Sequence, residues 1–111
     1  MLISKLLVVS GLSIVAALAQ DGLIRVTETD AKKAIVSKTD PDYPAMAKSM
    51  HLSGRAVVDV YIDADGKVEK AEPVSGNALL TGAAVNAVKK WKFNNSFGKK
   101  AVAAFAFEFK L

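Results

Sequence analysis

The sequence contains no cysteine and only one histidine, His51, among its 111 residues. Without thiols the chain can form no disulfide, no cysteine-based zinc site and no cysteine nucleophile. A single histidine also excludes a metal site built on two histidines. The composition therefore points away from enzymes, and it predicts no catalytic residue, no metal site and no cofactor.

A strong excess of charge is also lacking, because the formal net charge is only +4. Such a mild excess does not indicate binding to nucleic acid. Five lysines flank one predicted turn, and a solvated helix end is favoured there over a contact with a polyanion. They are Lys89, Lys90, Lys92, Lys99 and Lys100. Since 51% of the residues are hydrophobic, the chain is expected to fold as one small domain.

The first 19 residues carry a single charge, Lys5, followed by a mainly apolar stretch that ends in Ala17-Leu18-Ala19. The apolar stretch would span about 21 Å as a helix, which is shorter than a hydrocarbon core of roughly 30 Å. This pattern is typical of a signal peptide, residues 1–19, cleaved before Gln20. Export from a bacterial cell is thus predicted, and an uncleaved membrane anchor is the alternative.

Residues 20–38 form a polar lead-in segment with two possible short strands, at residues 23–26 and 34–36. A break in regular secondary structure follows at residues 39–44, because Pro41 and Pro44 disfavour helical backbone angles in the residues before them. Pro44 is well placed to begin a helix that reaches Met50.

From residue 55 to residue 62, hydrophobic residues occupy every second position, which predicts a strand with one buried face. Asp65-Gly66 in residues 63–67 is typical of a hairpin turn, and residues 68–74 return antiparallel, with Pro73 at a bulge or a sheet edge. The Asp-x-Asp-Gly spacing also begins a calcium loop. The later ligands are missing, and a turn is therefore favoured.

An apolar stripe at helical spacing predicts a second helix from Gly82 to about Trp91, with Thr81 as its N-cap and Trp91 in the core. The last strand is expected at residues 101–109, with its three phenylalanines on one face. The predicted fold is α+β, a three-stranded antiparallel sheet with two helices packed on one face. The last strand would pair with either of the other two strands.

The order and spacing of short motifs in residues 39–111 resemble the C-terminal domain of the TonB energy transducers. The matching motifs are Pro41-x-Tyr43-Pro44, Gly54-x-Ala56-Val57, Asp65-Gly66-Lys67-Val68, Val74-Ser75-Gly76, Ala83-Ala84 with Ala87-Val88, and Trp91-Lys92-Phe93. The resemblance implies the same order of helix, hairpin, helix and final strand. It also implies a location in the periplasm of a Gram-negative bacterium, or anchorage in the inner membrane facing the periplasm.

By resemblance, such a domain binds the TonB-box segment of an outer-membrane transporter, which adds as an extra strand along the last strand. Main-chain hydrogen bonds then give affinity, and pockets for alternate side chains give specificity. The residues expected to contact the partner on the last strand are Val102, Ala104, Ala106 and Glu108. Alternation alone does not tell whether the amide of Ala104 points to the neighbouring strand or to the open edge.

Residues before the first helix are a second candidate contact, because the family often has Gln where this chain has Asp40. Tyr43 and Pro44 are equally consistent with partner contact and with a structural start of the helix. A full transducer also has a histidine in its membrane anchor and a long proline-rich spacer. Residues 1–19 contain no histidine, and the three prolines of the chain form no run, so coupling to an inner-membrane motor is not predicted. Pairing of a second copy through the last strand is the alternative function.

Overall fold

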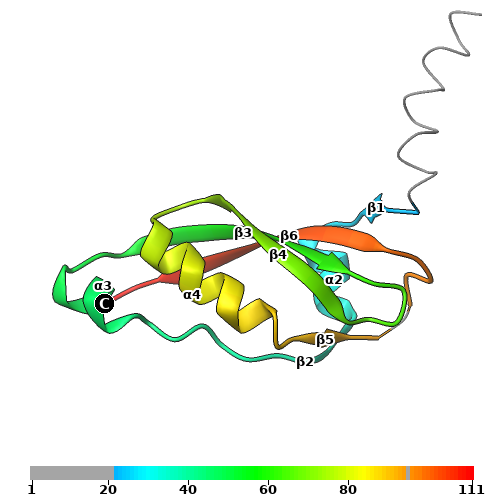
Figure 1. Cartoon of the computed structure of the whole chain (residues 1–111), viewed down its shortest axis with the longest axis horizontal. Coiled ribbons are helices and arrows are strands. Elements are labelled where there is room, and N and C mark those ends of the chain that lie inside the picture. Colours follow the sequence, from blue (N-terminus) through cyan, green and yellow to red (C-terminus); the bar gives the residue numbers. More distant parts are fainter. Residues whose placement is uncertain (1–21, 95) are drawn as a thin grey trace, which may run out of the picture.

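The computed structural model describes residues 22–94 and 96–111, and the predicted signal peptide lies outside them. The fold is α+β, as predicted (Figure 1). The described elements are β1 (Ile24–Arg25), α2 (Glu28–Lys33), β2 (Ile35–Ser37), α3 (Ala45–Ser49), β3 (Gly54–Ile62), β4 (Val68–Ser75), α4 (Ala78–Val88), β5 (Lys92–Phe93) and β6 (Ala101–Phe109).

The main sheet has the strand order β1-β6-β3-β4. β6 runs antiparallel to β3 over its whole length, from Gly54 opposite Phe109 to Ile62 opposite Ala101. On its other side, β6 pairs in parallel with the two-residue strand β1. A separate sheet joins β2 and β5. The predicted three-stranded sheet is therefore wrong by one strand in the described part of the chain, because β1 is too short to show an alternation.

The core lies on the face of the sheet that β3 and β6 turn toward α4 (Figure 1). The alternation predicted this face, and Val58, Val60 and Phe105 are all fully or almost fully buried there. Trp91 follows α4 and meets Phe105 edge to face, with 5.2 Å between the ring centroids. Trp91 is only 5% exposed, which confirms its predicted place in the core.

Both predicted short strands of the lead-in segment exist, as β1 and β2, but the helix between them was not predicted. Thr27 caps α2, since its hydroxyl oxygen accepts a hydrogen bond from the amide of Asp30 at 3.1 Å. Ala31, in the middle of α2, is fully buried. α2 spans six residues, too few to display an apolar period, so only its cap and its end charges could have indicated it.

Both predicted helix starts need a correction. Pro44 is the N-cap of α3 rather than its first residue. α4 begins at Ala78 instead of Gly82, because the side-chain oxygen of Asn77 accepts a hydrogen bond from the amide of Leu79 at 2.9 Å. Thr81 is buried inside the helix. α3 contacts α4 at the end of the sheet where the chain terminates (Figure 1).

The turn between β3 and β4 has the predicted conformation. Gly66 has a φ of 94°, and a Cβ atom there would lie only 1.9 Å from the carbonyl oxygen of Phe93. The carboxylate of Asp63 accepts hydrogen bonds from the amides of Asp65 and Lys67, both at 2.9 Å. The carboxylate of Asp63 therefore shapes a turn. Pro73 lies on β4 next to a register shift, as predicted for a bulged outer strand.

Among the residues that the structure describes, no helix is long and apolar enough to cross a membrane. The same residues contain no group of three or more histidine, cysteine or acidic side chains placed to hold a metal ion.

Candidate functional site

The hydrogen bonds between β1 and β6 show which residues of β6 have backbone N–H and C=O groups that point away from β3. The amide of Ile24 donates to the carbonyl of Lys100 at 2.9 Å, and the amide of Val26 donates to the carbonyl of Val102 at 3.0 Å. In a strand, the N–H and C=O groups of one residue point the same way, and successive residues alternate. The backbone groups of the even-numbered residues of β6 therefore point away from β3.

Three residues of this outward edge have no strand beside them in the described part of the chain. They are Ala104, Ala106 and Glu108. This open stretch follows directly after the pairing with β1, which ends at Val102. The question that alternation left open is thus answered, because the amide of Ala104 points to the open edge.

Val102 does not belong to the open edge, although it was expected there. It is opposite Arg25 of β1, and it is only 3% exposed. The prediction of an edge that is free from residue 101 to residue 109 is therefore wrong at its beginning. The cause is the lead-in segment, which returns along the sheet and covers the first residues of β6.

The side chains of the open stretch leave its backbone accessible. Ala104 and Ala106 are half-buried, and each carries a single methyl group. Glu108 is exposed, and its carboxylate accepts a hydrogen bond from the Nε of Arg55 at 2.7 Å. Most natural edge strands protect themselves with charged side chains, prolines or bulges. Here one ion pair at the end of the stretch is the principal charged feature.

A groove of about 340 Å³ lies beside the C-terminal half of this edge. Its walls come from the end of β6 and from the residues that precede α3. They are Asp40, Pro41, Tyr43, Phe107, Glu108, Phe109 and Lys110. The fold thereby brings together Asp40, Tyr43 and Glu108, which belong to the two separate candidate regions of the sequence. We call this space the edge groove.

Two contacts hold the segment of residues 39–44 in place. The indole N–H of Trp91 donates to the carbonyl of Thr39 at 2.8 Å, and the hydroxyl of Tyr43 donates to the carbonyl of Leu52. The ring of Tyr43 also meets Phe109 edge to face, at 5.5 Å between centroids. Tyr43 is thus both structural and part of the groove wall. The role of Trp91 in anchoring this segment was not predicted, since the sequence indicated only a core residue.

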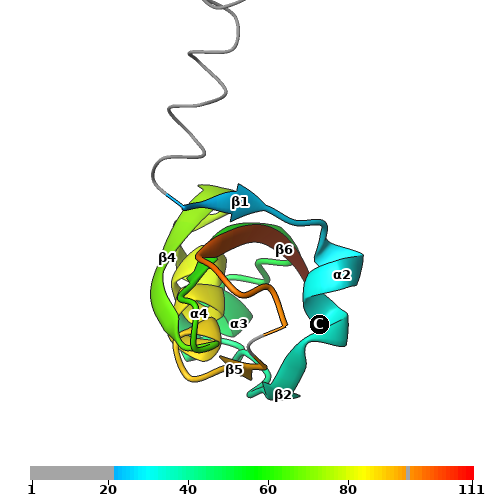
Figure 2. The same cartoon turned by 90° about the vertical axis from the view of Figure 1, so that its right-hand side faces the viewer.

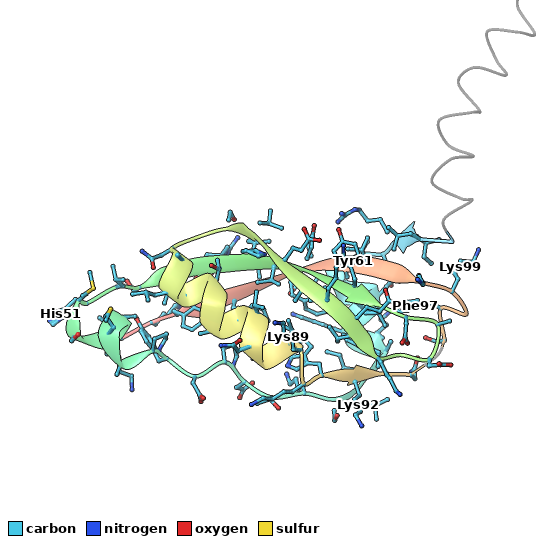
Figure 3. All side chains as sticks on the ribbon, viewed as in Figure 1. His51, Tyr61, Lys89, Lys92, Phe97 and Lys99 are labelled. Carbon is cyan, nitrogen blue, oxygen red and sulfur yellow. The ribbon has the colours of Figure 1, made fainter. Side chains whose placement is uncertain are left out.

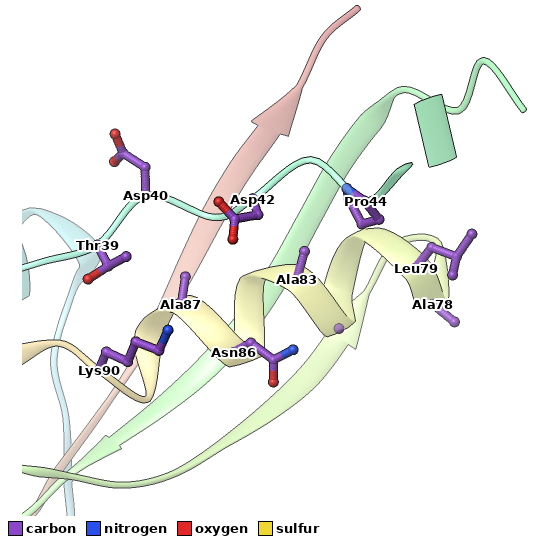
Figure 4. A pocket seen from close by; sticks show the side chains of 11 residues that line it. Thr39, Asp40, Asp42, Pro44, Ala78, Leu79, Ala83, Asn86, Ala87 and Lys90 are labelled. Atoms are coloured by element: carbon purple, nitrogen blue, oxygen red, sulfur yellow. The ribbon is translucent and has the colours of Figure 1, made fainter. Parts of the chain in front are cut away.

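On the other side of the same segment lies a second groove of about 360 Å³, lined by one side of α4 (Figure 4). Pro44 lines this second groove and not the edge groove. Asp40 lines both. Asp40 therefore occupies the boundary between the two spaces, and Pro44 is separated from the open edge of β6.

Two further cations border the edge groove, because Lys110 lines it and the ammonium of Lys48 lies 5.8 Å from the centroid of the Tyr43 ring. Lys89 follows α4, Lys92 lies on β5 and Lys99 precedes β6, whereas His51 lies at the end of the molecule that carries α3 and the C-terminus (Figure 1 and Figure 3). On β4, the hydrogen bond and the negative charge of Glu72 raise the pKa of Lys70 above its usual value.

Residues 39–111 match the family described as Gram-negative bacterial TonB protein C-terminal. The chain belongs to the TonB C-terminal family. It is 33% identical over 66 residues to protein TonB of Vibrio cholerae serotype O1 (strain ATCC 39315 / El Tor Inaba N16961). That match covers 57% of this chain and only 27% of the Vibrio cholerae TonB.

The fold is also similar to the solution NMR structure of the Pseudomonas aeruginosa TonB CTD, with a TM-score of 0.57 and 25% sequence identity. The superposition covers 69% of this chain and 84% of the Pseudomonas aeruginosa domain. The TonB family match begins at residue 39. β1, α2 and β2 therefore precede the residues that match the family, and β1, which covers the start of β6, is among them.

Proposed function

We propose that this chain is a non-catalytic protein-binding module that binds an extended segment of a TonB-dependent outer-membrane transporter. The segment adds as a strand to the outward edge of β6 at Ala104, Ala106 and Glu108. One observation carries the proposal, namely a stretch of central-sheet backbone whose outward groups have no strand partner in the described residues. Membership of the TonB C-terminal family supports the class of partner.

The edge groove gives this mode of binding a source of specificity. Alternate side chains of an added strand point to opposite faces of the sheet. On the face that carries Phe107 and Phe109, they would enter the groove beside Asp40 and Tyr43. The aromatic walls favour an apolar side chain, and the rim carries both a carboxylate, Asp40, and an ammonium group, Lys110. Main-chain hydrogen bonds to β6 would supply affinity that does not depend on the partner's sequence.

The proposed location is the periplasm. The family is described as Gram-negative bacterial, and residues 1–19 have the pattern of a signal peptide. Anchorage in the inner membrane through an uncleaved segment 1–19, with the domain facing the periplasm, is the alternative. Recovery of the full-length chain from the inner-membrane fraction would support the anchor, whereas a mature chain beginning at Gln20 in the periplasmic fraction would support export.

The test uses synthetic peptides from the periplasmic N-terminal segments of TonB-dependent transporters, titrated into the nitrogen-15-labelled chain. We expect shifts of the amide resonances of Ala104, Ala106 and Glu108, together with slower hydrogen exchange at these three amides. Scrambled peptides serve as composition controls. A panel in which no peptide binds, or shifts confined to the second groove around Pro44, would contradict the proposal.

Pairing of a second copy through the same edge is the competing function, and the small side chains of Ala104 and Ala106 favour it. Sedimentation of the chain alone at increasing concentration distinguishes the two. A concentration-dependent dimer whose formation is blocked by a transporter peptide would show that both use the open edge of β6.

A further inference from the structure

The start of the β6 edge is covered by an N-terminal arm, which we define as residues 24–33, comprising β1 and α2. Two main-chain hydrogen bonds, from Ile24 to Lys100 and from Val26 to Val102, attach the arm to β6. Arg25 reaches across β6 and forms an ion pair with Asp59 of β3, with 3.6 Å between nitrogen and oxygen. The arm thus contacts two strands of the sheet.

The helix of the arm, α2, provides a second attachment to the rest of the fold. α2 lies alongside β6 (Figure 2), and its residue Ala31 is fully buried in the core. Ala34, which follows α2, is 2% exposed, and its carbonyl accepts a hydrogen bond from Asn94 at 2.7 Å. The arm is therefore built into the fold, with β1 in the sheet and Ala31 of α2 in the core, although it lies outside the family match.

An added strand would have to lie in line with β1, because both pair with the same outward edge at a spacing of about 4.8 Å. Such a strand meets the arm as soon as it extends from Ala104 toward Val102. The pairing available to a partner is thus limited to residues 104–108, roughly 17 Å of strand at about 3.3 Å per residue. The other end of this stretch opens into the edge groove.

We infer that the N-terminal arm is a stop that sets the register of the added strand and thereby determines specificity. This inference rests on the proposed function. Ala104 and Ala106 present identical methyl groups, and a slip by two residues would keep every side chain on its own face. Without a stop, two registers of the added strand would therefore have similar free energies at the open edge. With the arm in place, a slip toward Val102 is blocked, and one partner side chain stays beside Asp40 and Tyr43.

The test releases the arm by the double substitution Ile24→Pro and Val26→Pro, which deletes both donated hydrogen bonds. Arg25→Pro is the matched control, because the amide of Arg25 lies between the two donors and points away from β6. Faster hydrogen exchange at the amide of Val102, by about tenfold or more, shows that the arm has been released. If that amide stays protected, Ala31→Glu expels α2 from the core instead, with the exposed Lys33→Glu as its control.

Register is read by disulfide cross-linking, which the absence of native cysteines makes specific. Ala104→Cys is combined with a single cysteine placed in turn at each position of the transporter peptide that binds best. In the parent and in the Arg25→Pro variant, we expect cross-linking at one peptide position. In the released variant, we expect a second product, shifted by two residues and within about tenfold of the first in yield.

Each outcome separates the inference from the proposed function. An unchanged single register in a variant whose Val102 amide exchanges freely would overturn the stop, while peptide binding to the edge would stand. A second register already present in the parent would also overturn it. If no transporter peptide binds or cross-links to any variant, the proposed function fails, and the stop fails with it.

Discussion

The two long outer edges of the main sheet differ in how they meet solvent. β4 is the outer strand on one side, and it carries exposed charged residues at 69, 70 and 72, followed by Pro73 beside a register shift. The open stretch of β6 on the other side carries two alanines and a glutamate that is already paired with Arg55. β4 thus has the features that keep edge strands from pairing, whereas the open stretch of β6 has few of them.

This difference indicates where the molecule can accept another strand. Charges at an edge oppose the approach of a second backbone, and proline removes a donor from it. The same chain therefore protects one edge and leaves part of the other accessible. The accessible part is bounded by the N-terminal arm at one end and by the edge groove at the other.

The largest effect is expected from Trp91→Ala, which removes the support beneath the open edge of β6. Trp91 packs against Phe105 and holds Thr39, so its loss leaves a cavity and frees the segment that forms the groove wall. We expect the free energy of unfolding to fall by roughly 3–5 kcal/mol. Denaturant melts measure the change, and a loss below about 1 kcal/mol would contradict the buried role of Trp91.

A pair of adjacent proline substitutions separates the inward and outward sides of β6. Ala103→Pro removes a donor that points to β3 and should destabilise the chain by roughly 3 kcal/mol. Ala104→Pro removes an outward donor, so it should weaken peptide binding by about tenfold and cost less than about 1 kcal/mol of stability. Circular dichroism melts and peptide titrations measure both. Equal destabilisation by the two variants would show that residue 104 does not face an open edge.

The sequence predicted the parts of the fold that have a clear signal among residues adjacent in the chain. Alternation located β3 and the buried face of β6, and Asp65-Gly66 located the turn, because these signals depend only on neighbouring residues. β1 was predicted only as a possible strand. Its two paired residues show no period, and its partner β6 is distant in the sequence.

The candidate site was predicted in its members but not in its geometry. Asp40, Tyr43 and Glu108 were named from a resemblance, yet only the folded chain shows that they share one groove. Val102 was misplaced because no local pattern tells which strand covers an edge. The outward direction of Ala104 required the hydrogen bonds of a strand far away in the sequence. Long-range pairing is what sequence reasoning could not supply.

The contrast between the edges can be reduced by removing the protection of β4. Lys70→Thr, Glu72→Thr and Pro73→Thr together give that edge a neutral surface with high strand propensity. We expect concentration-dependent self-association of this triple variant, measured by sedimentation, under conditions where the parent does not change. Lys99→Thr serves as the control for the lost positive charge. A triple variant that sediments like its parent would show that these residues do not protect β4.

The smallest effect is expected at Glu108, the charged residue of the open stretch. Its carboxylate is paired with Arg55, but both side chains are well exposed, at 48% and 65%. An exposed ion pair contributes at most about 1 kcal/mol, so Glu108→Gln should leave the unfolding transition almost unchanged.

Removal of the charge nevertheless leaves the edge without its repulsive group. Self-association of Glu108→Gln should therefore be stronger than that of the parent by a few-fold, because like charges on two approaching copies no longer repel. Arg55→Gln is the informative control, since it breaks the same ion pair while keeping the negative charge. If the two variants associate equally, the ion pair governs the edge; if only Glu108→Gln associates, the charge itself protects it.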